Sequence, residues 1–168
     1  AAINHVLVER SLTHPNVFTK LKIKGAGASR EDRLPLSDTQ IRELLPEYQS
    51  NDVAWALFVT LRDTGARVSE IAGLTVADCD LEARVIHIRP TPWRRLKTHS
   101  SERSLPLSPD AQSALETLIS TKAKEELIFP RYAKDRGRDA ASAMLMKRFR
   151  RVITDKKLSM HSLRHRMK

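Results

Sequence analysis

The strongest constraint on the fold is a series of helix start signals, each followed by apolar residues at helical spacing. Ser37 followed by Gln40 has the form of a capping box, in which two side chains satisfy each other's backbone N–H groups. Asn51 can cap a second helix, and the pair Ser108-Pro109 is a typical start of a later one. These signals predict a domain built mainly from short amphipathic helices.

The apolar residues of these segments recur at intervals of three and four, which places them on one helical face. They are Ile41, Leu44, Leu45 and Tyr48; Val53, Ala54, Leu57, Phe58 and Leu61; Val68, Ile71, Ala72 and Leu74; Ala111, Ala114, Leu115, Leu118 and Ile119; and Leu145, Phe149, Val152 and Ile153 in a helix over 141–153. Gly65 is expected to end the second helix. A basic loop is expected over 131–140.

Two short runs between these helices have the pattern of strands. Val85–Ile88 alternates and is rich in β-branched residues, and Ser104–Leu107 is a second apolar run after a polar, basic connection. Pro106 cannot donate to a neighbouring strand, so the second run is expected at an edge. The predicted fold class is therefore mainly α with a small antiparallel β-sheet or hairpin (α+β).

The positive charge is concentrated in the second half of the chain. Residues 1–90 hold 11 Lys and Arg against 12 Asp and Glu, whereas residues 91–168 hold 19 against 8. Such a surplus indicates a polyanionic partner such as DNA or RNA, and a solvated basic surface is the alternative. A single cysteine, Cys79, excludes an internal disulfide. No apolar run is long enough for a membrane span or a signal peptide, which favours the cytoplasm.

Three separated segments contain residues that could bind a phosphate. Arg67 follows a glycine turn at the start of a helix, where backbone N–H groups favour anions, although a surface ion pair with Glu70 would also explain it. Lys97 lies on the basic hairpin connection 93–103 and could donate a proton to an oxygen leaving phosphorus, although a solvated turn is an equal alternative. His161, Arg164 and His165 fall on one helical face.

The order of these motifs is more specific than any of them alone. The series T-G-A-R-V-S-E-I-A-G-L, then a lysine before S-L-P-L-S, then H-S-L-R-H resembles the catalytic domain of the tyrosine recombinases, the phage integrase family, from about Leu34 to Lys168. The resemblance implies three segments: residues 1–19 as the final helix of a core-binding domain, 20–33 as a basic linker and 34–168 as a catalytic domain incomplete at its C-terminus.

The resemblance also implies roles for individual residues. Arg67, His161 and Arg164 would stabilise the pentacoordinate phosphorane, and Lys97 would protonate the leaving 5′-hydroxyl. Glu70 and His165 would be accessory residues. In the family a tyrosine attacks phosphorus and forms a 3′-phosphotyrosyl link without metal or cofactor, but Tyr48 and Tyr132 both precede the H-x-x-R motif. We therefore expect a bacterial or phage-encoded recombinase fragment that binds DNA and does not cleave it.

The predicted partner is double-stranded DNA, with a monomer in isolation, a tetramer on DNA for the full-length parent, and no role for a membrane. The predicted contacts are cationic residues of the hairpin connection, the basic loop and the fifth helix. They are Arg94, Arg95, His99, Arg103, Arg131, Lys134, Arg136, Arg138, Lys147, Arg148, Arg150 and Arg151.

Two other functions compete with the recombinase interpretation. One is a non-catalytic basic DNA-binding module, which would need positive charge but not the ordered set of Lys97, His161 and Arg164. The other is a metal-free phosphodiesterase that uses His161 and Lys97 as acid and base. His161 and His165 have the spacing of a zinc pair but lack further ligands nearby in the sequence, so no metal is expected.

Overall fold

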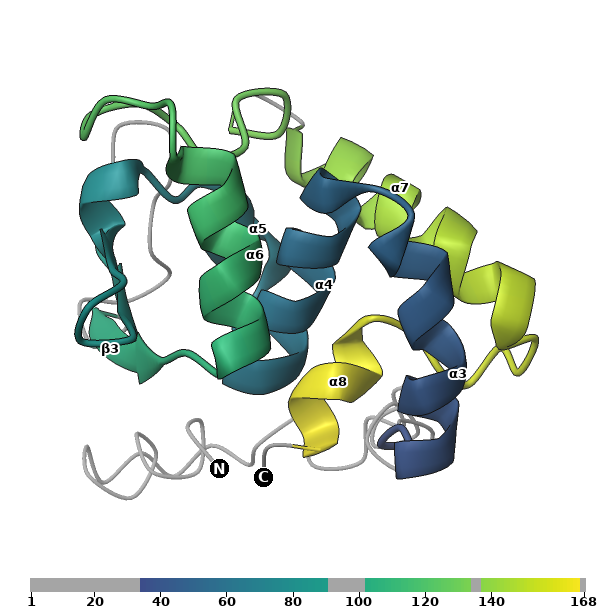
Figure 1. Ribbon diagram of the computed structural model, residues 1–168. Helices are drawn as coiled ribbons and strands as arrows, with labels where there is room; N and C mark the ends of the chain where they lie inside the picture. Colours follow the sequence, from purple (N-terminus) through teal and green to yellow (C-terminus); the bar gives the residue numbers. More distant parts are fainter. Residues whose placement is uncertain (1–33, 91–101, 134–136, 167–168) are drawn as a thin grey trace, which may run out of the picture. The chain divides into compact units, whose positions relative to one another are not determined.

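The computed structural model describes residues 34–90, 102–133 and 137–166, all within the unit Arg33–Lys168. The unit consists of helices and one small sheet, whose strands lie in the sequence between the first and the last helices (Figure 1). The elements are α3 (Asp38–Gln49), α4 (Asp52–Thr64), α5 (Val68–Ala72), η1 (Val76–Asp78), β1 (Cys79–Asp80), β2 (Val85–Ile88), β3 (Arg103–Pro106), α6 (Pro109–Ile119), α7 (Gly137–Val152) and α8 (His161–Arg166). The predicted fold class, mainly α with a small antiparallel sheet, is confirmed.

The predicted caps begin the helices where the sequence places them. Ser37 and Gln40 form both hydrogen bonds of the capping box at α3. The side chains of Asn51 and Ser108 accept hydrogen bonds from backbone N–H groups in the first turns of α4 and α6. Gly65 ends α4 with φ 59°, a left-handed conformation that glycine adopts without steric cost.

Helix α4 is the centre of the unit and packs against α3, α5, α6, α7 and α8 (Figure 1). Seven consecutive or near-consecutive residues between Ala54 and Leu61 are buried, as expected of a helix covered on most sides. Tyr48 of α3 stacks on Phe58 at 4.0 Å between ring centroids and donates a hydrogen bond to the carbonyl of Leu145. This tyrosine therefore ties α3, α4 and α7 together.

The sheet has the antiparallel order β1–β2–β3, with Ile88 opposite Arg103 and Val85 opposite Pro106. Pro106 thus lies on an edge strand, as predicted. The short strand β1 was not expected, because two residues are too few to give an alternating pattern. Ile86 and Ile88 point into the core.

Helix α7 begins at Gly137, so the prediction of a loop over the whole of 131–140 is wrong. A Cβ at position 137 would lie 2.1 Å from the carbonyl oxygen of Tyr132. Only glycine permits this close approach, which lets the helix begin earlier than its apolar pattern indicates. The core-binding helix expected within residues 1–19 and the linker over 20–33 lie outside the described residues.

Candidate functional site

Arg67 lies where two helices meet. Gly65 ends α4, and Arg67 is the extended residue that precedes α5. Its backbone N–H donates to Oε2 of Glu70 at 2.8 Å, and its Nη1 donates to Oε1 of the same carboxylate at 2.9 Å. The side chain of Arg67 remains 44% exposed. The ion pair considered from the sequence is therefore present, but it fixes one edge of a guanidinium that still faces solvent.

Glu70 is a buried carboxylate, 2% exposed, with two arginine partners. Besides Arg67, it accepts a 2.7 Å hydrogen bond from Nη2 of Arg103, the first residue of β3. Burial alone would raise the pKa of Glu70, but the hydrogen bonds from Arg103 and from the Arg67 backbone lower that pKa below its usual value. Glu70 is therefore ionised at neutral pH and is not a surface partner of Arg67.

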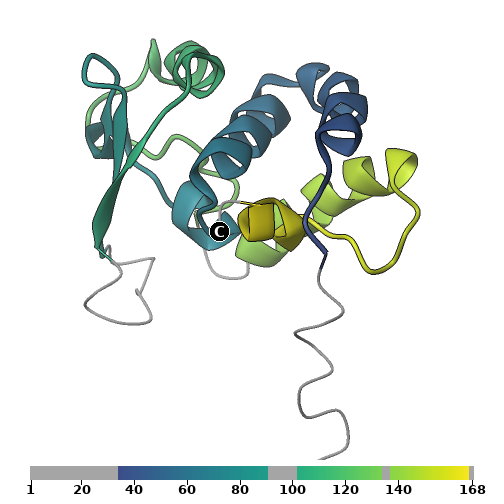
Figure 2. The ribbon, with the colours of Figure 1, turned by 90° about the horizontal axis from the view of Figure 1, so that it is seen from below.

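Helix α8 brings the H-x-x-R residues to the same place. Ser162 and Leu163 are buried and anchor the helix, while His161 is exposed. The backbone N–H of His161 donates to Oγ of Ser159 at 3.2 Å. Nη1 of Arg164 donates to the carbonyl of Gly65 at 3.0 Å, which ties α8 to the turn before Arg67. Figure 2 shows α8 beside the end of α4.

A cleft of about 370 Å³ joins these residues. Arg67, His161 and Arg164 all line it, although up to 97 positions separate them in the sequence. Arg138, near the start of α7, lines the same cleft. Three guanidinium groups and an imidazole around one hollow form an arrangement suited to a phosphate. Lys97, the fourth predicted catalytic residue, lies outside the described residues.

His165 lies behind His161 rather than in the lining of the cleft. The two rings meet edge to face with centroids 4.9 Å apart. Nε2 of His165 is buried, and the described residues offer it no hydrogen-bond partner. His165 thus supports the His161 ring by contact, an arrangement that their spacing of four predicts.

Helix α7 presents its predicted DNA contacts unevenly. Lys147 is exposed, whereas Arg148 donates to the carbonyl of Glu47 at 2.6 Å and Arg151 pairs with the Glu47 carboxylate. Arg150 donates to the carbonyls of Ile153, Asp155 and Leu158 and so holds the loop that leads to α8. These internal contacts were not predicted, because the sequence pattern marks the arginines only as polar.

The other predicted DNA contacts divide between described and undescribed positions. Arg131 is exposed, with its guanidinium 5.9 Å from the Tyr132 ring centroid, and Arg103 is engaged with Glu70. The remainder lie outside the described residues, namely Arg94, Arg95, His99, Lys134 and Arg136.

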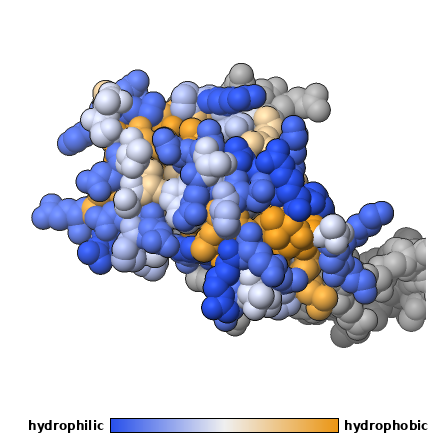
Figure 3. All heavy atoms as spheres, turned by 45° about the vertical axis from the view of Figure 1, so that its right-hand side comes forward, coloured by the Kyte–Doolittle hydropathy of each residue, from blue (hydrophilic) through white to orange (hydrophobic). Residues whose placement is uncertain are grey.

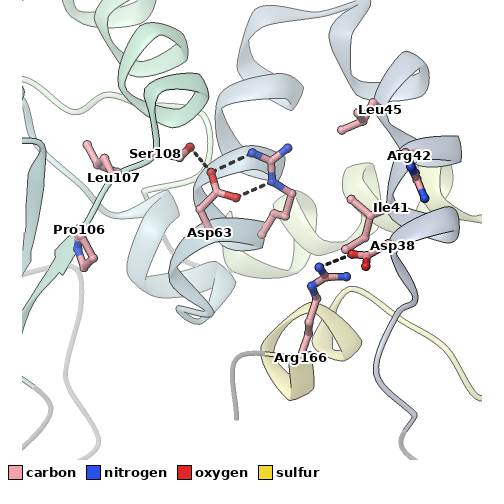
Figure 4. A pocket seen from close by; sticks show the side chains of 10 residues that line it. Asp38, Ile41, Arg42, Leu45, Asp63, Pro106, Leu107, Ser108 and Arg166 are labelled. Carbon is pink, nitrogen blue, oxygen red and sulfur yellow. Dashed lines mark hydrogen bonds and ion pairs between the residues drawn. The ribbon is translucent and has the colours of Figure 1, made fainter.

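A second hollow, of about 700 Å³, lies between α3, the end of α4, the β3–α6 junction and α8 (Figure 4). Its charged groups are largely paired with one another. Arg62 pairs with Asp63, whose carboxylate also accepts from Ser108, and Arg166 pairs with Asp38. The hydrogen bond from Arg62 to Asp63 raises the pKa of that guanidinium. Three arginines and two aspartates line this hollow, whereas three arginines and a histidine line the cleft without any carboxylate. The hollow is therefore less suited to an anion than the cleft.

The surface seen in Figure 3 is mainly hydrophilic, with apolar residues gathered in a few places. Over the described ranges, no three His, Cys, Asp or Glu side chains are grouped closely enough to hold a metal ion. Within the same ranges, every helix is too short or too polar to cross a membrane.

Comparison with known proteins identifies similar sequences and folds. The sequence profile of the phage integrase family matches residues 35–168. The transposase of transposon Tn916 from Enterococcus faecalis is 27% identical over 131 aligned residues, which cover 62% of this chain and 32% of the relative.

Solved structures show the same fold. The XerA recombinase aligns with a TM-score of 0.64 and 20% identity over 98% of this chain and 56% of its own. The integrase of transposon Tn1549, solved in complex with a circular intermediate DNA, aligns with a TM-score of 0.62 and 20% identity over 98% of this chain and 61% of its own. The chain thus spans about a third of the length of the curated relative and somewhat over half of these solved chains.

Proposed function

This chain belongs to the phage integrase family, the tyrosine recombinases, and on that premise we propose that its cleft holds the phosphate at which a DNA strand is broken and rejoined. The observation that carries the proposal is the convergence of Arg67, His161 and Arg164 on one hollow. A module that only binds DNA needs positive charge but has no need to gather these three residues at a single point.

In the proposed reaction the cations act on charge that develops at phosphorus. Arg67 and Arg164 bind the non-bridging oxygens, and His161 donates a further hydrogen bond. A tyrosine oxygen of the complete recombinase forms a bond to phosphorus, the bond to the 5′ oxygen breaks, and Lys97 supplies the proton to that oxygen. Each fixed donor contributes on the order of 10²–10³ in rate, by analogy with oxyanion-hole donors.

We further propose that the 168-residue chain does not carry out this step itself. The sequence has two tyrosines, and both are buried. Tyr48 lies in the core, where burial, the largest effect, raises the pKa of its hydroxyl. Tyr132 lines a separate small hollow with Asn51, Val53 and Phe129. Fixed cations lower a barrier but do not supply an attacking group.

The proposed partner is duplex DNA, and the Tn1549 integrase, a structural neighbour, was solved with DNA. We propose that the chain is a monomer in isolation, that the parent assembles as a tetramer on DNA, and that both act in the cytoplasm of a bacterium. The described residues expected to contact DNA are Arg138, which lines the cleft, and Arg131 and Lys147 outside it. If about six phosphates are neutralised, log K falls against log salt with a slope of about −5.

The experiment that tests the proposal compares two arginines of the same helical unit. Arg67→Ala removes a cation from the cleft, and Arg42→Ala, on the exposed side of α3 beside the second hollow, is the matched control. Fluorescence anisotropy with a labelled duplex is expected to show weaker binding for Arg67→Ala only. Equal losses for both variants would mean that the chain binds DNA through charge alone.

Cleavage is tested separately with a nicked suicide duplex. We expect no covalent protein–DNA adduct from this chain on a denaturing gel. An adduct that disappears in Tyr132→Phe would show that the chain has a nucleophile of its own.

A further inference from the structure

Two carboxylates are buried among the described residues, Glu70 at 2% and Asp78 at 3% exposure. Each binds an arginine at the base of the β2–β3 hairpin. Arg89 directly follows β2, and Arg103 is the first residue of β3, opposite Ile88. Both strands are therefore clamped to the helical part of the unit just where the connection between them starts.

In each clamp one guanidinium donates two hydrogen bonds, to a single oxygen of Asp78 in one case and to both oxygens of Glu70 in the other. Nε and Nη2 of Arg89 donate to Oδ1 of Asp78 at 3.1 and 2.9 Å. Nη2 and Nη1 of Arg103 donate to Oε2 and Oε1 of Glu70 at 2.7 and 3.3 Å. Two-point binding of this kind fixes direction as well as distance.

The clamps differ in what else the carboxylate holds. Asp78 accepts from the backbone N–H and the hydroxyl of Thr75 and so caps η1. Glu70 accepts from the backbone N–H and the guanidinium of Arg67, a residue of the cleft. The Arg103 clamp therefore reaches the candidate site, whereas the Arg89 clamp ends in a structural cap.

We propose that Arg103 is a positioning residue of the candidate site, which acts through Glu70 to hold the Arg67 guanidinium in place and ready for a phosphate. This inference rests on the proposed function, because it assumes that Arg67 binds a phosphate. It assigns Arg103 a role different from the direct DNA contact that its position in a basic segment predicts.

The physical reason is the charge balance of the cluster. If Arg67 were the only partner of Glu70, the two charges would cancel, and the pair would offer no net positive charge to a phosphate. With Arg103 also bound, the three groups carry a net positive charge, and Arg67 is the more exposed of the two arginines, at 44% against 29%. The surplus is therefore presented at the cleft.

The test compares Arg103→Gln with Arg89→Gln, which removes the other clamp and leaves Glu70 intact. Hydrogen exchange of the full chain, followed by mass spectrometry, reports on the Arg67 amide and on residues 76–80. We expect Arg103→Gln to speed exchange of the Arg67 amide by more than about tenfold, because a hydrogen bond to a charged group contributes about 1.5–3 kcal/mol. Arg89→Gln is expected to speed exchange only in 76–80.

A second measurement uses duplex DNA and the Arg67→Ala change in three backgrounds. In the original chain and in Arg89→Gln, Arg67→Ala is expected to raise Kd by the same factor. In Arg103→Gln that factor is expected to shrink at least about twofold, the low end of coupling within one ion-pair network. In Arg103→Lys, which keeps the positive charge, the factor by which Arg67→Ala raises Kd is expected to return to most of its original size.

The outcomes separate this proposal from the one on which it rests. If Arg103→Gln leaves the Arg67 amide protected, or if Arg89→Gln exposes it equally, Arg103 only holds the hairpin and the proposal is wrong. If Arg67→Ala has no effect on DNA affinity in any background, the proposed function fails, while the exchange comparison still decides whether Arg103 fixes Arg67. If Arg103→Gln does not fold, two variants replace it in the exchange comparison: the single variant Arg103→Lys and the double variant Arg103→Met/Glu70→Gln. The Arg67 amide is again either exposed, as the proposal expects, or protected, which would contradict it.

Discussion

The cleft and the last two turns of α7 are both rich in arginine, but they use it differently. Arg148, Arg150 and Arg151 donate to carbonyls and a carboxylate of their own unit and hold α3 and the loop before α8 in place. Arg67 and Arg164 are also held, by Glu70 and by the Gly65 carbonyl, yet both line a hollow. The comparison shows that a sequence reveals how many cationic side chains a segment has. It does not reveal which of them bind groups of the protein itself and which face a ligand.

The largest effect is expected from removing the carboxylate on which the cleft depends. Glu70→Ala removes the buried carboxylate and leaves the guanidinium groups of Arg67 and Arg103 without their shared negative partner. Breaking a buried ion pair from one side costs about 3–5 kcal/mol of unfolding free energy. Urea denaturation measures it, and Glu82→Ala, at an exposed position, is the control. A loss similar to that of the control would mean that the cleft does not need this carboxylate.

The same carboxylate makes stability depend on pH. The pKa of Glu70 is lowered in the folded chain. Its contribution to the free energy of unfolding is therefore fully present above the unfolded pKa of about 4.3 and is lost as pH falls through the lower folded pKa. Glu70→Gln is expected to flatten the acid limb of the urea midpoint measured against pH. An unchanged acid limb would contradict the ion pairs described at Glu70.

The next prediction separates binding from stability at Arg67. Arg67→Ala is expected to weaken duplex binding by about 1.5–3 kcal/mol, the contribution of a hydrogen bond to a charged group. Its urea midpoint is expected to change much less than that of Glu70→Ala, because Arg103 still neutralises the buried carboxylate. A variant that loses stability and affinity in equal measure would erase the distinction between the cleft and α7.

On α7 we expect the opposite pattern at Arg150, a loss of stability with little loss of DNA affinity. Arg150→Ala is expected to lower the unfolding free energy by about 1–3 kcal/mol, since three loop carbonyls lose their donor. Duplex affinity, measured where the variant is fully folded, is expected to change less than in Arg67→Ala. The opposite order would restore Arg150 as a direct DNA contact.

The smallest effect is expected at Lys147, an exposed cation of α7. Lys147→Ala is expected to leave stability unchanged and to reduce the salt slope of duplex binding by about 1 if it contacts a phosphate. Titrations at three salt concentrations decide this. An unchanged slope would mean that Lys147 does not contact a phosphate.

Local signals predicted most of the fold, and the order of motifs predicted the cleft. The caps at Ser37, Asn51 and Ser108 depend on residues within one helical turn, so they are visible in sequence. Arg67, His161 and Arg164 each have local features suited to a phosphate, but it is the order of the motifs that indicates one shared site. The contact of Arg103 with Glu70 spans 33 positions, and nothing in either segment specifies it before the chain folds.

The start of α7 and the engagement of Arg150 were missed for a related reason. Gly137 normally marks a loop, and only the nearby Tyr132 carbonyl shows why a glycine is needed in a first helical turn here. Arg150 has the spacing of a solvent-facing residue, but the loop 153–158 folds back over it. Both depend on contacts between segments that are not adjacent in the sequence pattern.

Helix α8 has six residues, fewer than an isolated helix needs to persist in water. Ser162 and Leu163 must be buried before His161 and Arg164 can face the cleft, so the anion site exists only in the folded unit. Any polyanion that occupies it therefore stabilises folding by mass action. We expect the melting temperature to rise with DNA concentration, so that a thermal shift assay reports occupancy of the cleft without any turnover.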